Sequence, residues 1–176
     1  MFHPLRAALT LSLLLPALAA QTASYTFSGT ACTTGRLSTQ IGAVPMAVQG
    51  LPRPGQWFDI VTESSASYPW GNTRTVFVLT GVSNTNLGGL PLPFDLALLR
   101  PGSPDCGLLS TSCELVTRAP RADYQTQVAV RFDVPNSAAL LGLVLYQQVL
   151  SIETSTFGPP FSSMALSRLG RGVVGL

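Results

Sequence analysis

The segment YQTQVAVRFDV, residues 124–134, restricts the fold more than any other part of the sequence. Apolar and polar side chains alternate along it, and the face predicted to be buried carries Tyr124, Thr126, Val128, Val130, Phe132 and Val134. The other face carries Gln125, Gln127, Ala129, Arg131 and Asp133. A period of two is typical of an antiparallel sheet that has one face on a core and the other in water. Pro135 ends the predicted strand.

Several other short segments show strand character, whereas helical periodicity is not sustained. Strands are predicted at Ser24–Ser28, Ala43–Gln49, Gln56–Glu63, Thr75–Val82, Leu143–Ile152 and, in the segment MALSRL, at residues 164–169. The segment NSAALLG predicts one helical turn, with Asn136 as its N-cap and Gly142 as its stop. Turns rich in proline and glycine separate these segments. The pattern predicts an all-β fold, an antiparallel β-sandwich of about seven to nine strands with one short helical turn.

The first twenty residues, MFHPLRAALTLSLLLPALAA, have the pattern of a secretory signal peptide. Arg6 precedes the apolar run Ala7–Leu15, and Ala17 and Ala19 form an A-x-A cleavage pattern. No later segment offers about 18 uninterrupted apolar residues, so no membrane span is predicted. We therefore expect a signal peptide at residues 1–20 and a single secreted, extracellular domain at residues 21–176.

The charged residues exclude several classes of function. The sequence has ten basic residues and eight acidic ones, and all the basic residues are arginines because the sequence contains no lysine. Because no basic stripe is present, nucleic acid is not an expected partner. The one histidine, His3, lies in the predicted signal peptide, so Ser-His-Asp and Cys-His catalysis and the common zinc ligand sets lack a member. The sequence predicts no catalytic residues, no metal site and no cofactor.

The remaining route to catalysis is a pair of carboxylates, as in a glycosidase. Such a pair faces across a cleft at roughly 5 to 9.5 Å. The acids are scattered along the sequence, which favours solvated turn and strand positions: Asp59, Glu63, Asp95, Asp105, Glu114, Asp123, Asp133 and Glu153. A carboxylate-pair hydrolase is therefore the alternative to a non-enzymatic function.

Three aromatic residues are the candidate ligand-binding residues. Tyr68 and Trp70 lie in the polar segment ESSASYPWGNTR, residues 63–74, between two predicted strands. Their large amphipathic faces would suit stacking on a sugar ring. Trp70 could instead fold back and cap the end of the sandwich. Trp57 is followed by Phe58 in a predicted strand, so one of the two should point outward and Trp57 could extend the patch.

The segment LGGLPLPFDLALL, residues 87–99, is strongly apolar but interrupted by Pro91 and Pro93. The prolines and Asp95 exclude a membrane helix and disfavour a soluble one. We expect an extended, polyproline-like crossing at a sheet edge that covers the core of the sandwich. The Gly-rich end LGRGVVGL, residues 169–176, fits a final strand, a frayed end or a docking arm.

Taken in order, these motifs resemble an uncharacterised module of secreted bacterial proteins. The matching stretches are YTFSGTAC (25–32), GLPRPGQWFDI (50–60), LTGVSNTNLGGLPLPFDLALL (79–99), GSPDCGLL (102–109), FDVPNSAALLGLVLYQQVL (132–150) and SSMALSRL (162–169). The resemblance covers most of residues 21–176. It implies a β-sandwich and export, and it assigns no catalytic residue or ligand.

The resemblance also bears on the three cysteines, Cys32, Cys106 and Cys113. In an oxidising compartment two of them are expected to pair. The sequence alone allows a long-loop disulfide between Cys32 and Cys106 or a short-loop disulfide between Cys106 and Cys113. The resemblance favours Cys32 with Cys106, and it leaves Cys113 as an addition.

These features predict a non-enzymatic extracellular module for adhesion, cell-surface association or carbohydrate binding. The expected partner is a glycan or another component of a cell envelope, with the 63–74 segment as the expected contact loop. A third alternative is a structural surface protein that assembles with itself through an exposed edge strand.

Overall fold

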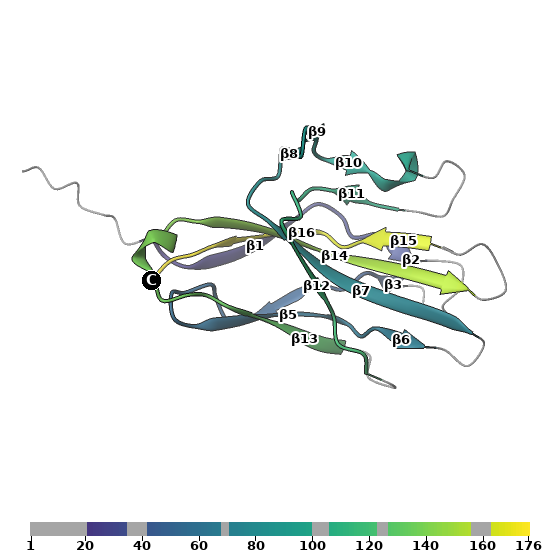
Figure 1. The fold of residues 1–176 in the computed structure, drawn as a ribbon, viewed down its shortest axis with the longest axis horizontal. Coiled ribbons are helices and arrows are strands. Elements are labelled where there is room, and N and C mark those ends of the chain that lie inside the picture. Colours follow the sequence, from purple (N-terminus) through teal and green to yellow (C-terminus); the bar gives the residue numbers. More distant parts are fainter. Residues whose placement is uncertain (1–20, 35–41, 68–70, 100–105, 123–126, 156–162) are drawn as a thin grey trace, which may run out of the picture.

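The computed structural model describes residues 21–34, 42–67, 71–99, 106–122, 127–155 and 163–176. It shows an all-β protein in which two antiparallel sheets pack face to face (Figure 1). In the described residues the helical structure consists of two short 3-10 turns, and no helix is long and apolar enough to cross a membrane. The predicted fold class is therefore confirmed. The predicted signal peptide lies outside the described residues.

The larger sheet has seven strands. Five of them run in the order β1 (Ser24–Ser28), β16 (Leu169–Val173), β14 (Val144–Ser155), β7 (Asn72–Gly81) and β12 (Leu115–Arg118). The short strands β6 (Ala66–Ser67) and β15 (Ser163–Leu166) pair with β7 and β14, respectively. The long ladder between β7 and β14, from Asn72 opposite Ser155 to Gly81 opposite Tyr146, forms the centre of this sheet.

The smaller sheet has three strands, β13 (Gln127–Asp133), β5 (Trp57–Glu63) and β4 (Ala47–Gln49), with β5 in the middle. Outside both sheets, β2 (Thr33–Thr34) pairs with β3 (Gly42–Ala43). The predicted strand Ala43–Gln49 is thus divided into β3 and β4. Pro45 lies between them and has no backbone donor for a continuous ladder.

The core lies between the two sheets and follows from the alternation in the sequence. Phe58 and Ile60 of β5 and Val130 of β13 are buried against Val76 of β7 and Val149 of β14. The exposed Gln127, Ala129 and Arg131 alternate with these buried positions along β13, as predicted. A sandwich core of this kind buries one face of each sheet.

The C-terminal segment forms an internal strand. β16 is hydrogen-bonded to β1 on one side and to β14 on the other, so LGRGVVGL contains a strand inside the sheet. Gly170 is required there because a Cβ would lie 2.4 Å from the hydroxyl of Tyr25. That hydroxyl donates to Gln147 Oε1 at 2.8 Å.

The predicted helical turn is present as η2 (Ala138–Leu140), but the predicted N-cap is wrong. Ser137, and not Asn136, has the extended backbone of an N-cap, and its side chain accepts from the amide of Ala139. Gly142 ends the turn with a φ of +84°, as predicted.

The segment LGGLPLPFDLALL folds differently from the predicted crossing. Strands β8 (Asn86–Leu87) and β9 (Leu90–Pro91) form a hairpin around Gly88 and Gly89, and β10 (Phe94–Asp95) and the turn η1 (Leu96–Leu98) follow. Both glycines have positive φ, which lets the chain reverse within two residues. β11 (Leu108–Leu109) then pairs with β10.

We call the elements from β8 to β11 the lid. Leu96 of the lid packs on Leu79 and Leu166 of the larger sheet, in an apolar cluster separate from the sandwich core. By strand alternation, Leu79 points away from Val78, which lies in the sandwich core. The lid therefore covers the outer face of the larger sheet, whereas the sequence predicted a cover for the core between the sheets.

Candidate ligand-binding cleft

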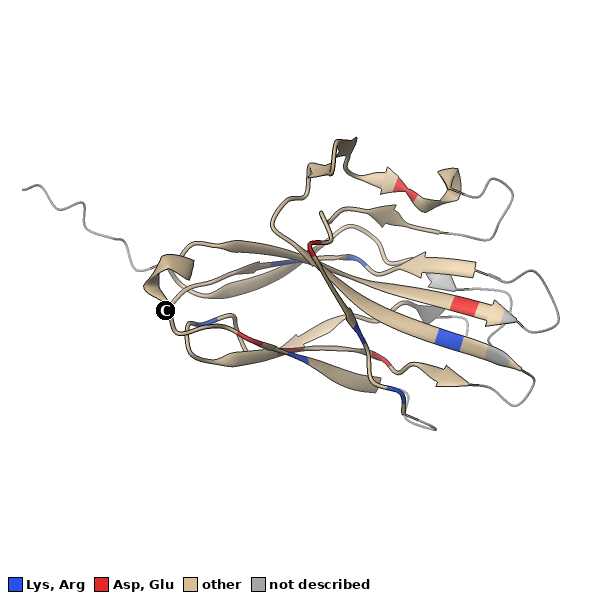
Figure 2. Ribbon diagram, in the orientation of Figure 1, with Lys and Arg blue, Asp and Glu red and all other residues tan. Residues whose placement is uncertain are grey.

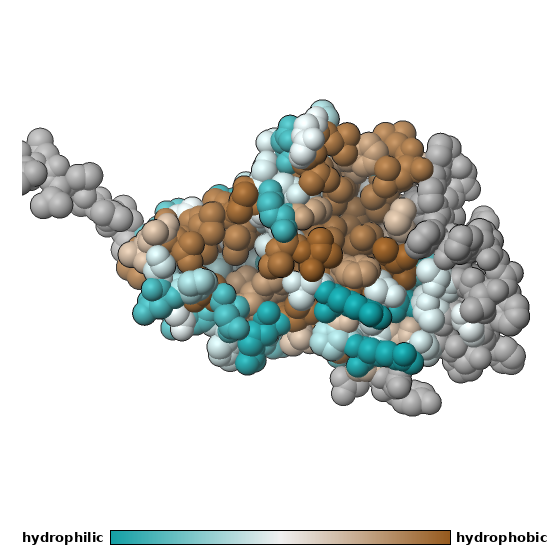
Figure 3. Space-filling view, viewed as in Figure 1, coloured by the Kyte–Doolittle hydropathy of each residue, from teal (hydrophilic) through white to brown (hydrophobic). Residues whose placement is uncertain are grey.

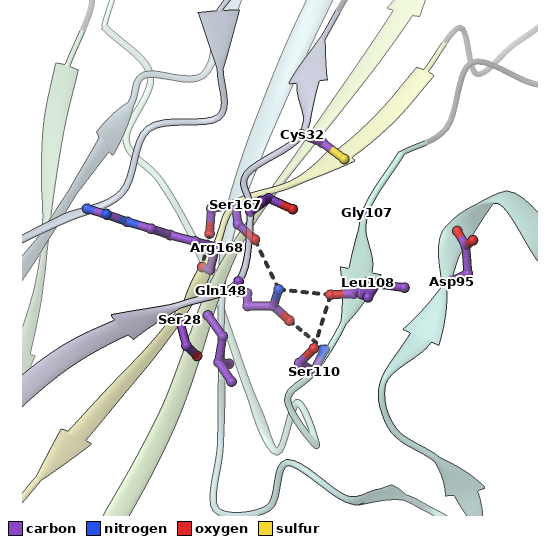
Figure 4. Close-up of a pocket in the computed structure, with 12 residues that line it drawn as sticks. Ser28, Cys32, Asp95, Gly107, Leu108, Ser110, Gln148, Ser167 and Arg168 are labelled. Carbon is purple, nitrogen blue, oxygen red and sulfur yellow. Dashed lines mark hydrogen bonds between the residues drawn. The ribbon is translucent and has the colours of Figure 1, made fainter.

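A cleft of about 350 Å³ lies between the lid and the larger sheet (Figure 4). One wall is β11, and the other is the chain after β1 together with the corner between β15 and β16. We call it the lid cleft. Its lining residues are Ser28, Gly29, Thr30, Cys32, Asp95, Gly107, Leu108, Ser110, Gln148, Ser167, Arg168 and Leu169.

The side chain of Gln148 joins the two walls. It is buried, and its Nε2 donates to the carbonyl oxygens of Leu108, at 3.0 Å, and Ser167, at 3.1 Å. Its Oε1 accepts from the backbone amide of Ser110 at 2.6 Å. Figure 4 shows this amide in the middle of the cleft, bonded toward both walls. Gln148 thus satisfies backbone groups of β11 that its partner strand leaves open.

The sequence analysis did not single out Gln148. The available signal is the pair Gln147 and Gln148 inside the apolar run LVLYQQVL. A buried amide needs hydrogen-bond partners, so adjacent glutamines in a strand predict polar networks on both faces of a sheet. On the opposite face Gln147 donates to the hydroxyl of Thr80 at 3.0 Å.

The disulfide between Cys32 and Cys106 connects the same two walls. The Cα atoms are 5.7 Å apart, and the two cysteines are 74 residues apart in sequence. The amide of Cys32 donates to Leu166 O, and the amide of Cys106 donates to Met164 O, each at 2.9 Å. Both cysteines are thereby fixed to strand β15. The favoured pairing is confirmed, and the short-loop alternative is wrong because Cys113 is free.

The residues at the cleft are mostly uncharged, and their polar groups lie beside a larger apolar surface. Ser28, Gly29 and Thr30 are exposed, and Gly107, with a φ of +117°, leaves backbone without a side chain in the opposite wall. The hydroxyls of Ser28 and Thr30 offer donors and acceptors to a ligand, and the Ser110 hydroxyl, which donates to Leu108 O at 3.3 Å, offers an acceptor.

The two charged lining residues are held by other parts of the chain. The carboxylate of Asp95 accepts from the amide of Ala97 at 3.0 Å. The guanidinium of Arg168 lies 3.9 Å from the centre of the Phe27 ring and donates to Met46 O. In Figure 4 the Arg168 side chain extends away from Gln148. The guanidinium of Arg168 is therefore bound elsewhere, and Asp95 leaves one exposed carboxylate at the cleft, which can accept from ligand hydroxyls.

Of the predicted aromatic residues, Tyr68 and Trp70 lie outside the described residues. Trp57 points outward from β5 with 50% of its surface exposed, and Phe58 is buried in the core. The guanidinium of Arg131 lies 4.0 Å from the centre of the Trp57 ring, and its Nε donates to Asp59 at 3.3 Å. Trp57 therefore lies on the smaller sheet and takes no part in the lid cleft.

Two carboxylates meet inside the sandwich at Arg74. Its guanidinium donates to Glu153 Oε1 at 3.0 Å and also to the carboxylate of Glu63. Figure 2 shows the blue and red positions side by side on β7 and β14. Burial raises the pKa of Glu63, the charge of Arg74 lowers it in part, and the charge of Glu153 raises it further. Because both carboxylates bind one guanidinium, they do not form an open catalytic pair.

Cys113 does not have the environment of a reactive thiol. Burial and the nearby charge of Glu114 both raise its pKa, which disfavours the thiolate. Its Sγ donates to Thr111 O at 3.1 Å. In the part of the chain that the structure describes, no group of three or more His, Cys, Asp or Glu residues is placed to hold a metal ion.

The chain matches no protein-family model, no curated protein and no solved structure with which it was compared. The resemblance to a secreted module stays a prediction. The lid cleft and the surfaces around it are the features that bear on function.

Proposed function

We propose that this protein is a non-enzymatic extracellular binding module that holds a neutral saccharide of a cell envelope in the lid cleft. The observation that carries the proposal is the construction of the cleft. A disulfide and a buried amide fix its two walls, and hydroxyl and backbone groups line it. Walls fixed before binding reduce the entropy that binding costs.

The size and polarity of the cleft support a sugar. Its volume of about 350 Å³ falls in the range of roughly 300–1,000 Å³ that is typical of small-molecule sites. A neutral sugar ring offers hydroxyls to Ser28, Thr30 and Ser110, and it offers C–H faces to Leu108 and Leu169. A charged ligand would find a single carboxylate and a single guanidinium, each already bonded within the chain.

The hydrolase alternative has less support. Glycoside hydrolysis requires two carboxyl groups on either side of the scissile bond, with access for substrate and water. Glu63 and Glu153 are instead joined by Arg74, which lies only 6% exposed between strands. Asp95 is the only carboxylate among the residues that line the lid cleft.

Binding to a glycan array tests the proposal. The wild-type protein should bind a defined subset of neutral glycans, and Leu108→Arg should weaken that binding at least tenfold by filling the cleft. Leu98→Arg is the matched control, since Leu98 is also an exposed lid leucine but does not line the cleft. A wild-type protein that binds no glycan, or equal losses in the two variants, would contradict the proposal.

A further inference from the structure

Strand β12 is an edge strand whose outer side is unusually apolar. Among the described strands it pairs only with β7, with Leu115 opposite Thr80 and Arg118 opposite Phe77. Leu115 and Val116 are each about half exposed, at 51% and 52%. Figure 3 shows apolar residues over the lid and over the adjoining part of the sandwich. Edge strands in monomeric proteins are commonly protected by lysine, proline or a bulge, and this sequence contains no lysine.

Among the described residues, the backbone groups of β12 at its even-numbered positions have no partner strand. The amide of Ala119, directly after the strand, donates to Val76 O of β7 at 2.8 Å. In an antiparallel ladder, alternate residues bond to the same neighbour. Leu115 and Thr117 therefore bond toward β7, and the amides and carbonyls of Val116 and Arg118 point to the open side.

The sequence around β12 is complementary to itself in one register. The segment is Glu114–Leu115–Val116–Thr117–Arg118. If a second copy adds in the antiparallel direction with Val116 opposite Val116, then Glu114 of each copy lies opposite Arg118 of the other. Registers shifted from this centre lose one or both of the opposite-charge pairs.

The same register also agrees with the hydrogen-bond pattern and with the side-chain faces. Val116 and Arg118 are the residues of β12 whose backbone groups point outward, and Glu114 lies directly before the strand. Val116 opposite Val116 would form a hydrogen-bonded pair, with Glu114 facing Arg118 at each end. By alternation their side chains share one face of the sheet, where cross-strand charge pairs interact directly. The carboxylate of Glu114 accepts from the hydroxyl of Ser112 at 2.6 Å and from the amide of Val82 at 3.1 Å, and these bonds lower its pKa. A carboxylate has about four acceptor positions, so Arg118 of a second copy can still bind it.

We propose that β12 pairs with β12 of a second copy about a two-fold axis at Val116, which joins the larger sheets of two molecules into one. The strand is short, so the interface belongs to the small, weak class. Such a dimer forms at high local concentration, as on a surface that holds many copies. This proposal does not depend on the lid cleft.

The strands at the other ends of the two sheets are β1, β4 and β13. β1 and β4 carry no charged residue, and in β13 a register centred on Phe132 would place Arg131 of each copy opposite Asp133 of the other. Arg131 is also already paired with Asp59 of β5. The arginine of the possible β13 pair is therefore already used within its own sheet.

A charge-swap experiment by analytical ultracentrifugation tests the pairing. Over micromolar to millimolar concentrations the wild-type protein should pass from monomer to dimer. Arg118→Glu alone and Glu114→Arg alone should each weaken the dimer at least tenfold, because like charges then face each other at both ends. An equimolar mixture of the two variants should dimerise again, since both end pairs become opposite in charge.

Arg171→Glu, a change at an exposed position of β16, is the control and should dimerise as the wild type does. If circular dichroism shows that Glu114→Arg is unfolded, the dimer affinity of Arg118→Glu compared with that of Arg171→Glu still tests the pairing. A wild-type protein that stays monomeric at all concentrations would overturn the proposal. So would an Arg118→Glu variant that dimerises as strongly as the control, or two folded variants whose mixture stays monomeric.

Discussion

Arg74 is the residue on which the polar end of the sandwich core depends. It is buried between β5 and β14, and it satisfies Glu153 and Glu63 together. Glu153 Oε2 is buried without a hydrogen-bond partner, so this carboxylate relies on Arg74 alone for its countercharge among the bonds of the described chain. Removal of one member of a buried ion cluster leaves the others uncompensated.

We therefore predict that Arg74→Met lowers the free energy of unfolding by about 3–5 kcal/mol. The exposed Arg171 provides the control, and Arg171→Met should change it by less than about 0.5 kcal/mol. Urea denaturation of the two variants and the wild type measures both values. A loss at Arg74 no larger than the loss at Arg171 would show that the cluster does not stabilise the fold.

Glu63 gives the same cluster a pH dependence. Its pKa is raised above its ordinary value of 4.5 by burial, less the effect of Arg74. The folded chain thus holds this proton more tightly than the unfolded chain. The contribution of Glu63 to stability is complete below the unfolded pKa and is lost as the pH rises through the folded pKa.

The variant Glu63→Gln cannot titrate, so its stability should increase relative to wild type between about pH 4 and about pH 7. Its altered contact with Arg74 adds an offset that does not vary with pH. Urea denaturation at both pH values measures the difference in the free energy of unfolding between Glu63→Gln and the wild type. If this difference instead falls as the pH rises, the effect of Arg74 outweighs burial and lowers the pKa of Glu63.

For single residues, the sequence predicted which face of a strand a side chain occupies better than it predicted the partners of that side chain. The period of two predicted that one of Trp57 and Phe58 points outward, and the structure shows that it is Trp57. The partners of Arg74 and Gln148 could not be predicted, since they lie up to 79 residues away in sequence on other strands. Only the three-dimensional register brings those side chains together.

The lid is attached to the outer face of the larger sheet through Leu96. Leu96 is buried against the larger sheet, whereas Leu98, two residues later in the same 3-10 turn, is 68% exposed. We predict that Leu96→Ala lowers the free energy of unfolding by about 2–3 kcal/mol and that Leu98→Ala changes it by less than about 0.5 kcal/mol. Hydrogen exchange should report faster exchange in the lid of Leu96→Ala. Equal costs at the two leucines would mean that the lid does not pack as described.

The disulfide between Cys32 and Cys106 connects the two walls of the lid cleft. Because the cysteines are 74 positions apart in sequence, loop entropy predicts a loss of about 4 kcal/mol in the double variant Cys32→Ser, Cys106→Ser. The free Cys113 offers a matched control, and Cys113→Ser should cost less than about 1 kcal/mol. Thermal and urea denaturation compare the two. The account would fail at this point if Cys113→Ser proved the more damaging change.

At the scale of elements, the predicted strands were correct where apolar residues alternate, as at β1, β5 and β13. The lid was predicted incorrectly because its prolines were taken to keep the chain extended. Two adjacent glycines, Gly88 and Gly89, reverse the chain instead. This reversal brings Leu96 to the outer face of the larger sheet. Nothing in the sequence around Leu96 distinguishes that face from the sandwich core.

For the whole molecule, the fold class followed from the sequence, but the candidate site did not. The lid cleft forms where the lid, the chain after β1 and the corner of β15 and β16 meet, and these segments are far apart in the sequence. The predicted aromatic site depends on Tyr68 and Trp70, which lie outside the described residues. An edge at β12 that no other described strand covers, and a fixed cleft on the same sheet, are the two features on which the proposals of surface binding and self-pairing rest.

The most direct test of the binding function is a titration of ¹⁵N-labelled protein with neutral oligosaccharides of cell-envelope type, followed by NMR. The account predicts shift changes at Ser28–Thr30, Gly107–Ser110 and Ser167–Leu169, with the sugar recovered unchanged. Shift changes confined to the face of Trp57, no binding of any sugar, or cleavage of the sugar would contradict it.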